Sequence, residues 1–102
     1  MSVDTFEASL HHATPPDGWS YALQALWWDA RGDWNKAHDL AQIDEADPRC
    51  AWVHAYLHRK EGDLSNAAYW YRRSGHAVAT GSLTHERQLI AASLLGGSSI
   101  GS

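Results

Sequence analysis

The fold is decided by two stretches of sequence, Ala25-Leu-Trp-Trp-Asp-Ala-Arg-Gly-Asp-Trp-Asn-Lys-Ala37 and Ala55-Tyr-Leu-His-Arg-Lys-Glu-Gly-Asp-Leu-Ser-Asn-Ala67. The two align on their Gly-Asp pairs, and Gly62 follows Gly32 by 30 residues. A glycine closes a helix readily because it adopts the left-handed conformation, and an aspartate directly after it can cap the next helix. Each stretch is therefore predicted to contain the turn of a helical hairpin, so the chain holds two copies of one unit.

Apolar residues recur at helical spacing on both sides of each turn, and no segment alternates as a half-buried strand does. The two copies are predicted over residues 19–47 and 48–76, because Pro48 suits the first turn of a helix and disfavours helix just before it. Their helices are expected over residues 19–31, 34–44, 48–61 and 64–74.

Shorter helices are expected on either side of the two hairpins. Asp4 can cap a helix over residues 4–13, and Ser82 or Thr84 can cap one that ends at Leu95. The chain is thus predicted to be a single all-α domain over residues 1–95 with about six helices. Residues 96–102 are rich in glycine and serine and are expected to be a disordered tail.

The composition excludes several classes of protein. The chain has 102 residues and a net charge of −4, so it lacks the basic excess of a general nucleic-acid binder. No apolar run approaches the ~20 residues of a membrane span, and no secretory signal is recognisable. Cys50 is the one cysteine, which rules out an intrachain disulfide. A cytoplasmic location is the expectation.

The two turn regions carry a further pattern, in which a small residue, a large ring, a glycine and an alanine follow one another at fixed spacing. These residues are Ala25, Trp28, Gly32 and Ala37 in the first copy and Ala55, His58, Gly62 and Ala67 in the second. The pattern resembles the tetratricopeptide repeat, although the period here is shorter than that family's ~34 residues. The resemblance implies a short superhelical stack of antiparallel helix hairpins, with residues 4–13 and 82–95 as caps.

The resemblance also implies a binding surface. It places Trp52, Tyr56 and Arg59 on the inner side of the first helix of the second copy, where such repeats bind extended peptides. Aromatic side chains are common anchors of binding energy, and arginine grips carboxylates with two hydrogen bonds. Adding the nearby Arg49 and Arg73, the sequence predicts an aromatic and basic groove for an acidic peptide segment or for a second copy of the chain. The alternative for the basic residues is a solvated face with local acidic partners.

Histidines are plentiful, at seven, and two of them have the spacing of metal ligands. His54 and His58 are four residues apart, so they share one side of a helix. His58 also takes the packing position that Trp28 has in the first copy, and this favours packing over ligation. Glu61 and His85 are the third ligands considered, and His38 has no spacing that points to a metal. The sequence therefore predicts no metal and no cofactor.

No catalytic residue is predicted either. The chain has no Gly-x-Ser-x-Gly motif, and Cys50 has no evident base beside it. The function expected is non-catalytic, a protein–protein interaction module. Two alternatives stay open: a small-molecule- or metal-binding protein that uses a pocket of histidine and tryptophan, and a purely structural subunit of an assembly.

Overall fold

The computed structural model describes residues 2–96, and this part of the chain contains six α-helices and no strand. The all-α prediction with about six helices is confirmed. The helices are α1 (Ser2–Ser9), α2 (Tyr21–Ala30), α3 (Trp34–Ala41), α4 (Pro48–Glu61), α5 (Leu64–Ser74) and α6 (Leu83–Gly96). Apart from Gly96, the predicted tail over residues 96–102 lies outside the described residues. None of the described helices is long and apolar enough to cross a membrane.

The two Gly-Asp turns are built alike. Gly32 and Gly62 have φ angles of 91° and 92°, in the left-handed region that suits glycine. The backbone N–H of the next residue, Asp33 or Asp63, donates to the carbonyl five residues earlier at 2.9 Å in both turns. Each carboxylate also accepts from the backbone N–H three residues later, at 3.0 Å and 3.3 Å. Equal residues at a 30-residue spacing thus produce equal turns.

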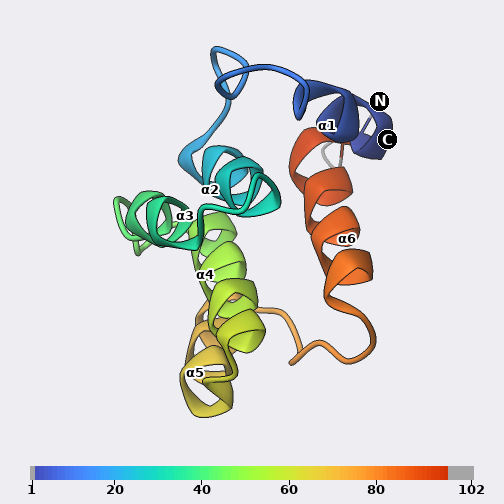
Figure 1. Ribbon diagram of the computed structural model, residues 1–102. Coiled ribbons are helices and arrows are strands. Elements are labelled where there is room, and N and C mark those ends of the chain that lie inside the picture. The colour runs from blue at the N-terminus through green and yellow to red at the C-terminus, as the bar shows by residue number, and fades with distance from the viewer. Residues whose placement is uncertain (1, 97–102) are drawn as a thin grey trace.

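Each turn joins two helices that pack closely, α2 with α3 and α4 with α5. Figure 1 shows α4 near the centre of the molecule, between α3 and α5 on one side and α6 on the other. The two flanking helices, α1 and α6, pack against each other, and α6 also contacts α2 and α4. The chain ends of the helical region therefore share one side of the hairpins.

Two helices end earlier than the sequence predicts. The helix expected over residues 4–13 ends at Ser9, because the N–H groups of the next three residues bond to carbonyls only three positions back. Ser9 Oγ also donates to the carbonyl of Phe6 at 2.6 Å. Asp4 lies in the first turn of this helix rather than before it. The helix expected over residues 34–44 ends at Ala41 in the same way.

The core is centred on α4, which packs against α2, α3, α5 and α6, and it extends to α1. Its largest fully buried side chains include Trp27 of α2, Tyr56 of α4, Tyr71 of α5 and Phe6 of α1. The indole N–H of Trp27 donates to the carbonyl of Ser9 at 3.2 Å, which ties α1 to α2. These aromatic side chains supply much of the core, since rings of this size bury large areas.

Candidate functional site

Three histidines converge where the first hairpin meets the second. His54 and His58 lie one turn apart on the side of α4 that faces α3, and His38 of α3 projects between them. His38 Nε2 is 3.0 Å from His54 Nε2, and one ring nitrogen from each of the three lies within 4.8 Å of the others. We call His38, His54 and His58 the histidine cluster. His54 and His58 are buried, and His38 is half-buried.

Tryptophans enclose the histidine cluster from both hairpins. The ring of Trp34 stacks on His38 with centroids 4.8 Å apart, and Trp70 of α5 stacks on His54 at 4.0 Å. The indole N–H of Trp34 donates to the carbonyl of Leu57 at 2.9 Å, which fixes that ring against α4. The imidazoles are thus held in defined orientations by packed aromatic walls.

Burial sets the charge state of the cluster. Burial, and then the facing His38 and His58, lower the pKa of His54 from 6.5 to about 3. Burial, and then His58, also lower the pKa of His38. The desolvated interior disfavours the charged imidazolium, and like charges disfavour it further. Two of the three imidazoles are therefore neutral at physiological pH.

The remaining ring nitrogens of the cluster differ in their partners. His58 Nδ1 lies 2.7 Å from a carboxylate oxygen of Glu61, one of the two residues considered as a third ligand. His54 Nδ1 is buried and has no hydrogen-bond partner within residues 2–96. His85, the other residue considered, lines a separate cleft beside α6.

His38 is the member that sequence spacing missed. It is 16 residues from His54 in the chain, and only the packing of α3 on α4 brings the two together. The sequence did contain one observation that could have identified His38. If the two hairpins stack, the second helix of the first hairpin packs on the first helix of the second. Applied to the histidines, that stacking would have singled out His38.

The residues predicted to bind a partner lie in different surroundings, and two of them belong to buried polar networks. Tyr56 is 1% exposed, and its hydroxyl donates to the buried carboxylate of Asp29 at 2.8 Å. Lys60 Nζ donates to the other oxygen of Asp29 at 2.9 Å. Burial, and then Asp29, raise the pKa of Tyr56, so its hydroxyl keeps its proton and acts as a donor. Tyr56 thus joins α4 to α2 and offers no surface to a peptide.

Arg59 is likewise engaged within the fold. Its guanidinium pairs with Glu86 of α6 at 2.8 Å and also donates to the carbonyl of Gly81. Glu86 is buried, and its second oxygen accepts from the hydroxyl of Tyr71. This network fastens α6 to α4 and α5.

Trp52 lies at the edge of a cleft. The residue is 8% exposed, and its ring stacks on His76 with centroids 3.7 Å apart. The cleft has a volume of about 370 Å³ and separates the start of α6 from the linker that follows α5. Val78 and Leu89 line it and are 57% and 50% exposed. We call this feature the Trp52 cleft.

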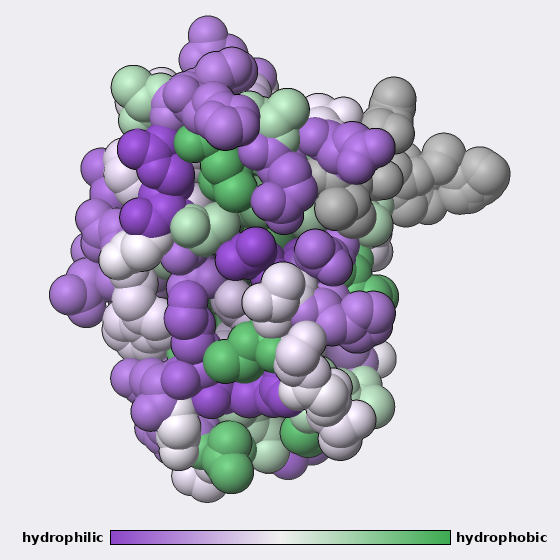
Figure 2. Space-filling model, turned by 45° about the vertical axis from the view of Figure 1, so that its right-hand side comes forward, coloured by the Kyte–Doolittle hydropathy of each residue, from purple (hydrophilic) through white to green (hydrophobic). Residues whose placement is uncertain are grey.

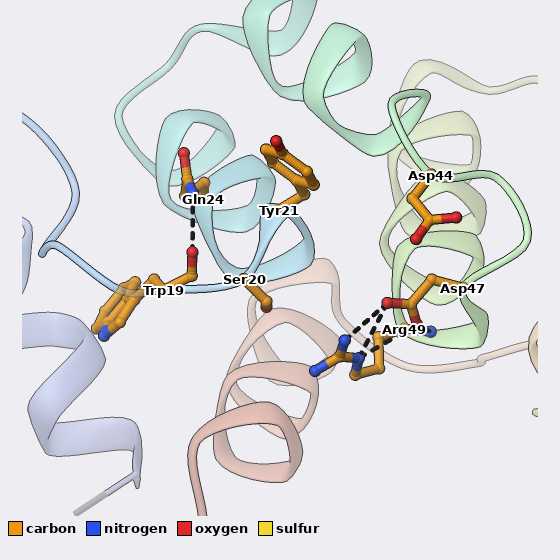
Figure 3. A pocket seen from close by; sticks show the side chains of 7 residues that line it. All are labelled: Trp19, Ser20, Tyr21, Gln24, Asp44, Asp47 and Arg49. Carbon is orange, nitrogen blue, oxygen red and sulfur yellow. Dashed lines mark hydrogen bonds and ion pairs between the residues drawn. The ribbon is translucent and has the colours of Figure 1, made fainter.

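Arg49 lies beside another surface hollow, of about 350 Å³, which Figure 3 shows from close by. Its guanidinium turns toward Asp47, with contacts of 2.7–3.2 Å, and Asp44 lines the same hollow. The Asp47 carboxylate caps α4 as well, and its hydrogen bonds with Arg49 lower its pKa. Arg49 is thus already neutralised by a carboxylate.

Arg73 lies on α5, away from both hollows. Its guanidinium stacks over the rings of Tyr69 and Trp70 and donates to the Tyr69 hydroxyl at 2.9 Å. The five predicted residues therefore do not line one groove in the described structure. Arg49 and Trp52 reach different hollows, and Tyr56 lies in the core.

No family model, curated protein or solved structure matches this chain.

Proposed function

We propose that this chain is a small, non-catalytic interaction module that binds an extended protein segment in the Trp52 cleft. The observation that carries the proposal is the exposed apolar lining of this cleft, with Val78 and Leu89 beside the edge of Trp52. Five of its nine lining residues are apolar, so the segment it fits carries apolar side chains. The resemblance to tetratricopeptide repeats supports the proposal, because those repeats bind extended peptides.

The linker along the cleft supports an extended partner. Residues 76–80 belong to no helix or turn, and no backbone–backbone hydrogen bond of the described part of the chain involves residues 77–80. Free main-chain N–H and C=O groups beside apolar pockets are the features by which proteins bind extended segments. In this proposal the main-chain groups of the linker supply hydrogen bonds, apart from the Ala79 N–H, which bonds to the hydroxyl oxygen of Tyr71, and the cleft supplies apolar contact.

Charge adds little to this recognition. Arg49 and Arg59, which the sequence suggested for an acidic segment, already pair with Asp47 and Glu86. Figure 2 shows hydrophilic residues over much of one face, with separate apolar patches between them. An apolar segment therefore suits the site better than an acidic one. We place the module in the cytoplasm, where its buried free thiol at Cys50 stays reduced.

The test is a selection of short peptides on the full chain, followed by fluorescence polarisation with the selected sequences. Val78→Glu and Leu89→Glu put a charge into the cleft and should weaken binding at least about 10-fold. Leu64→Glu is the matched control, because Leu64 is equally apolar and 67% exposed but does not line the cleft. Equal binding by all three variants would contradict the proposal.

A second copy of the chain is the other occupant that fits an apolar cleft. Light scattering over a range of concentrations distinguishes the two. If the chain is a dimer and Leu89→Glu dissociates it, the occupant of the Trp52 cleft is a second subunit rather than a peptide. That result would favour the alternative of a structural subunit of an assembly.

A further inference from the structure

The histidine cluster brings together three side chains that can bind a metal, where core packing alone would require only apolar rings. Three imidazoles drawn from two hairpins face one another, although a packed core is more readily filled with apolar rings. We propose that His38, His54 and His58 bind a divalent transition-metal ion of the zinc class between α3 and α4. This site is separate from the Trp52 cleft and does not depend on it.

The spacing of the ring nitrogens fits such an ion. Zinc–nitrogen bonds of about 2.0–2.1 Å in a tetrahedron place two ligand nitrogens roughly 3.3 Å apart. The His38 and His54 Nε2 atoms are 3.0 Å apart, and the most distant pair of ligand nitrogens is within 4.8 Å. Small side-chain rotations therefore suffice to bring all three onto one ion.

The hydrogen bonds around the cluster also fit a metal site. The bond from His58 Nδ1 to Glu61 is the outer contact that metal-bound histidines usually make, and it leaves His58 Nε2 free for the ion. His54 Nδ1, which has no hydrogen-bond partner among the described residues, is the nitrogen away from the Nε2 that would face the ion, so it stays available as the protonated nitrogen of a neutral ligand ring.

The electrostatics favour a cation there as well. On the exposed side, carboxylate oxygens of Glu61 and Asp63 lie within 4.8 Å of a ring nitrogen of His58. Three imidazole nitrogens with carboxylates at the rim suit a dication, whose fourth position is left to water.

A bound ion would join the two hairpins. His38 belongs to the first hairpin, and His54 and His58 belong to the second, so one ion links α3 to α4 directly. The stacked rings of Trp34 and Trp70 hold two of the ligands in place. The ion would thereby fix the angle between the hairpins.

The test is a zinc titration of the full chain in competition with a chromogenic chelator. The expected result is one zinc ion per chain, with affinity at least about 100-fold lower in His38→Gln, because loss of an outer partner alone costs about 10- to 100-fold. Glu61→Gln should weaken binding about 10-fold for the same reason. His85→Gln is the matched control, since His85 is outside the cluster, and it should bind as the unaltered chain does.

A second measurement needs no variant and so holds if His38→Gln fails to fold. Long-range ¹H–¹⁵N NMR spectra of the imidazoles should show zinc shifting the ring nitrogens of the three cluster histidines at one equivalent. At a free zinc concentration about 100-fold above the Kd, the melting temperature should rise by about 10 °C or more. Zinc shifts confined to the four other histidines, or equal affinity in His38→Gln, would overturn the inference. So would the absence of 1:1 binding.

Discussion

The Nε2 atoms of His38 and His54 lie 3.0 Å apart across the contact between α3 and α4. At this distance the two rings cannot both carry a positive charge at low cost, because like charges in a desolvated site repel strongly. His58 approaches both rings, with centroids 5.1 Å from His38 and 4.8 Å from His54. The contact between the hairpins is therefore sensitive to protonation.

We expect the protein to lose stability as pH falls from about 6.5 toward 3. The pKa of His54 is near 6.5 in the unfolded chain and about 3 in the folded chain. Between these values the unfolded chain binds a proton that the folded chain does not, so the free energy of unfolding falls by up to about 1.4 kcal/mol per pH unit. Urea unfolding at pH 7, 6 and 5, with a chelator present, measures this slope, to which His38 adds in the same direction.

The matched control for this slope is a pair of variants. His54→Gln removes the buried imidazole and should flatten the dependence between pH 7 and 5. His12→Gln removes an exposed imidazole and should leave it unchanged. An unaltered slope in His54→Gln would show that other groups cause the acid sensitivity.

Asp29→Ala should destabilise the fold by about 3 kcal/mol. The change leaves the buried hydroxyl of Tyr56 without an acceptor and takes the carboxylate partner from Lys60. Tyr56→Phe removes one hydrogen bond only and should cost about 1–2 kcal/mol. Asp44→Ala, at an exposed carboxylate, is the control and should change the unfolding free energy by less than about 0.5 kcal/mol. Equal urea midpoints for Asp29→Ala and Asp44→Ala would count against this network.

The sequence predicted the helices of the second hairpin to the residue, at Pro48–Glu61 and Leu64–Ser74. Local chemistry decides those ends: Pro48 opens the first helix, Gly62 closes it, and Asp63 caps the next. The ends that were predicted too late, after Ser9 and Ala41, carry no proline or glycine at the boundary. There the backbone tightens into i to i−3 bonds, and no residue type signals that change.

The site was harder to predict, because its residues are set by packing between hairpins. Periodicity placed Tyr56 and Arg59 on α4. It could not show that Asp29 of α2 accepts from Tyr56, or that Glu86 of α6 pairs with Arg59. A tyrosine with a buried acceptor lies in the core, and an arginine with a buried carboxylate binds that carboxylate rather than a peptide. The same limit hid the contact of His38 with His54.

Gly62→Ala should cost about 1–2 kcal/mol of unfolding free energy. Beyond its two chain neighbours, no atom of the described residues lies within 4 Å of the position of an added Cβ, so the cost comes from the backbone φ of 92° alone. Gly62→Asn should cost less, because asparagine tolerates the left-handed region better. The same pair of substitutions at Gly32 should give matching values if the two turns are equivalent. Thermal unfolding measures all four, and a cost well above this range would point to a contact that the open space at Gly62 does not show.

The pairing of Arg59 with Glu86 should appear as an energetic coupling between α4 and α6. Removing Arg59 leaves the buried Glu86 carboxylate without its cationic partner. Removing Glu86 leaves the Arg59 guanidinium without its carboxylate and the Tyr71 hydroxyl without its acceptor. Either change should cost about 3 kcal/mol of unfolding free energy. Because the two changes remove one shared interaction, the double variant Arg59→Ala/Glu86→Ala should cost clearly less than the sum, by about 1–3 kcal/mol.

Arg72→Ala is the control partner for Glu86→Ala. Arg72 is exposed on α5, so that pair should be additive within about 0.5 kcal/mol. Additivity in the Arg59 pair would mean that α6 is held by apolar packing through residues such as Ile90 rather than by this network.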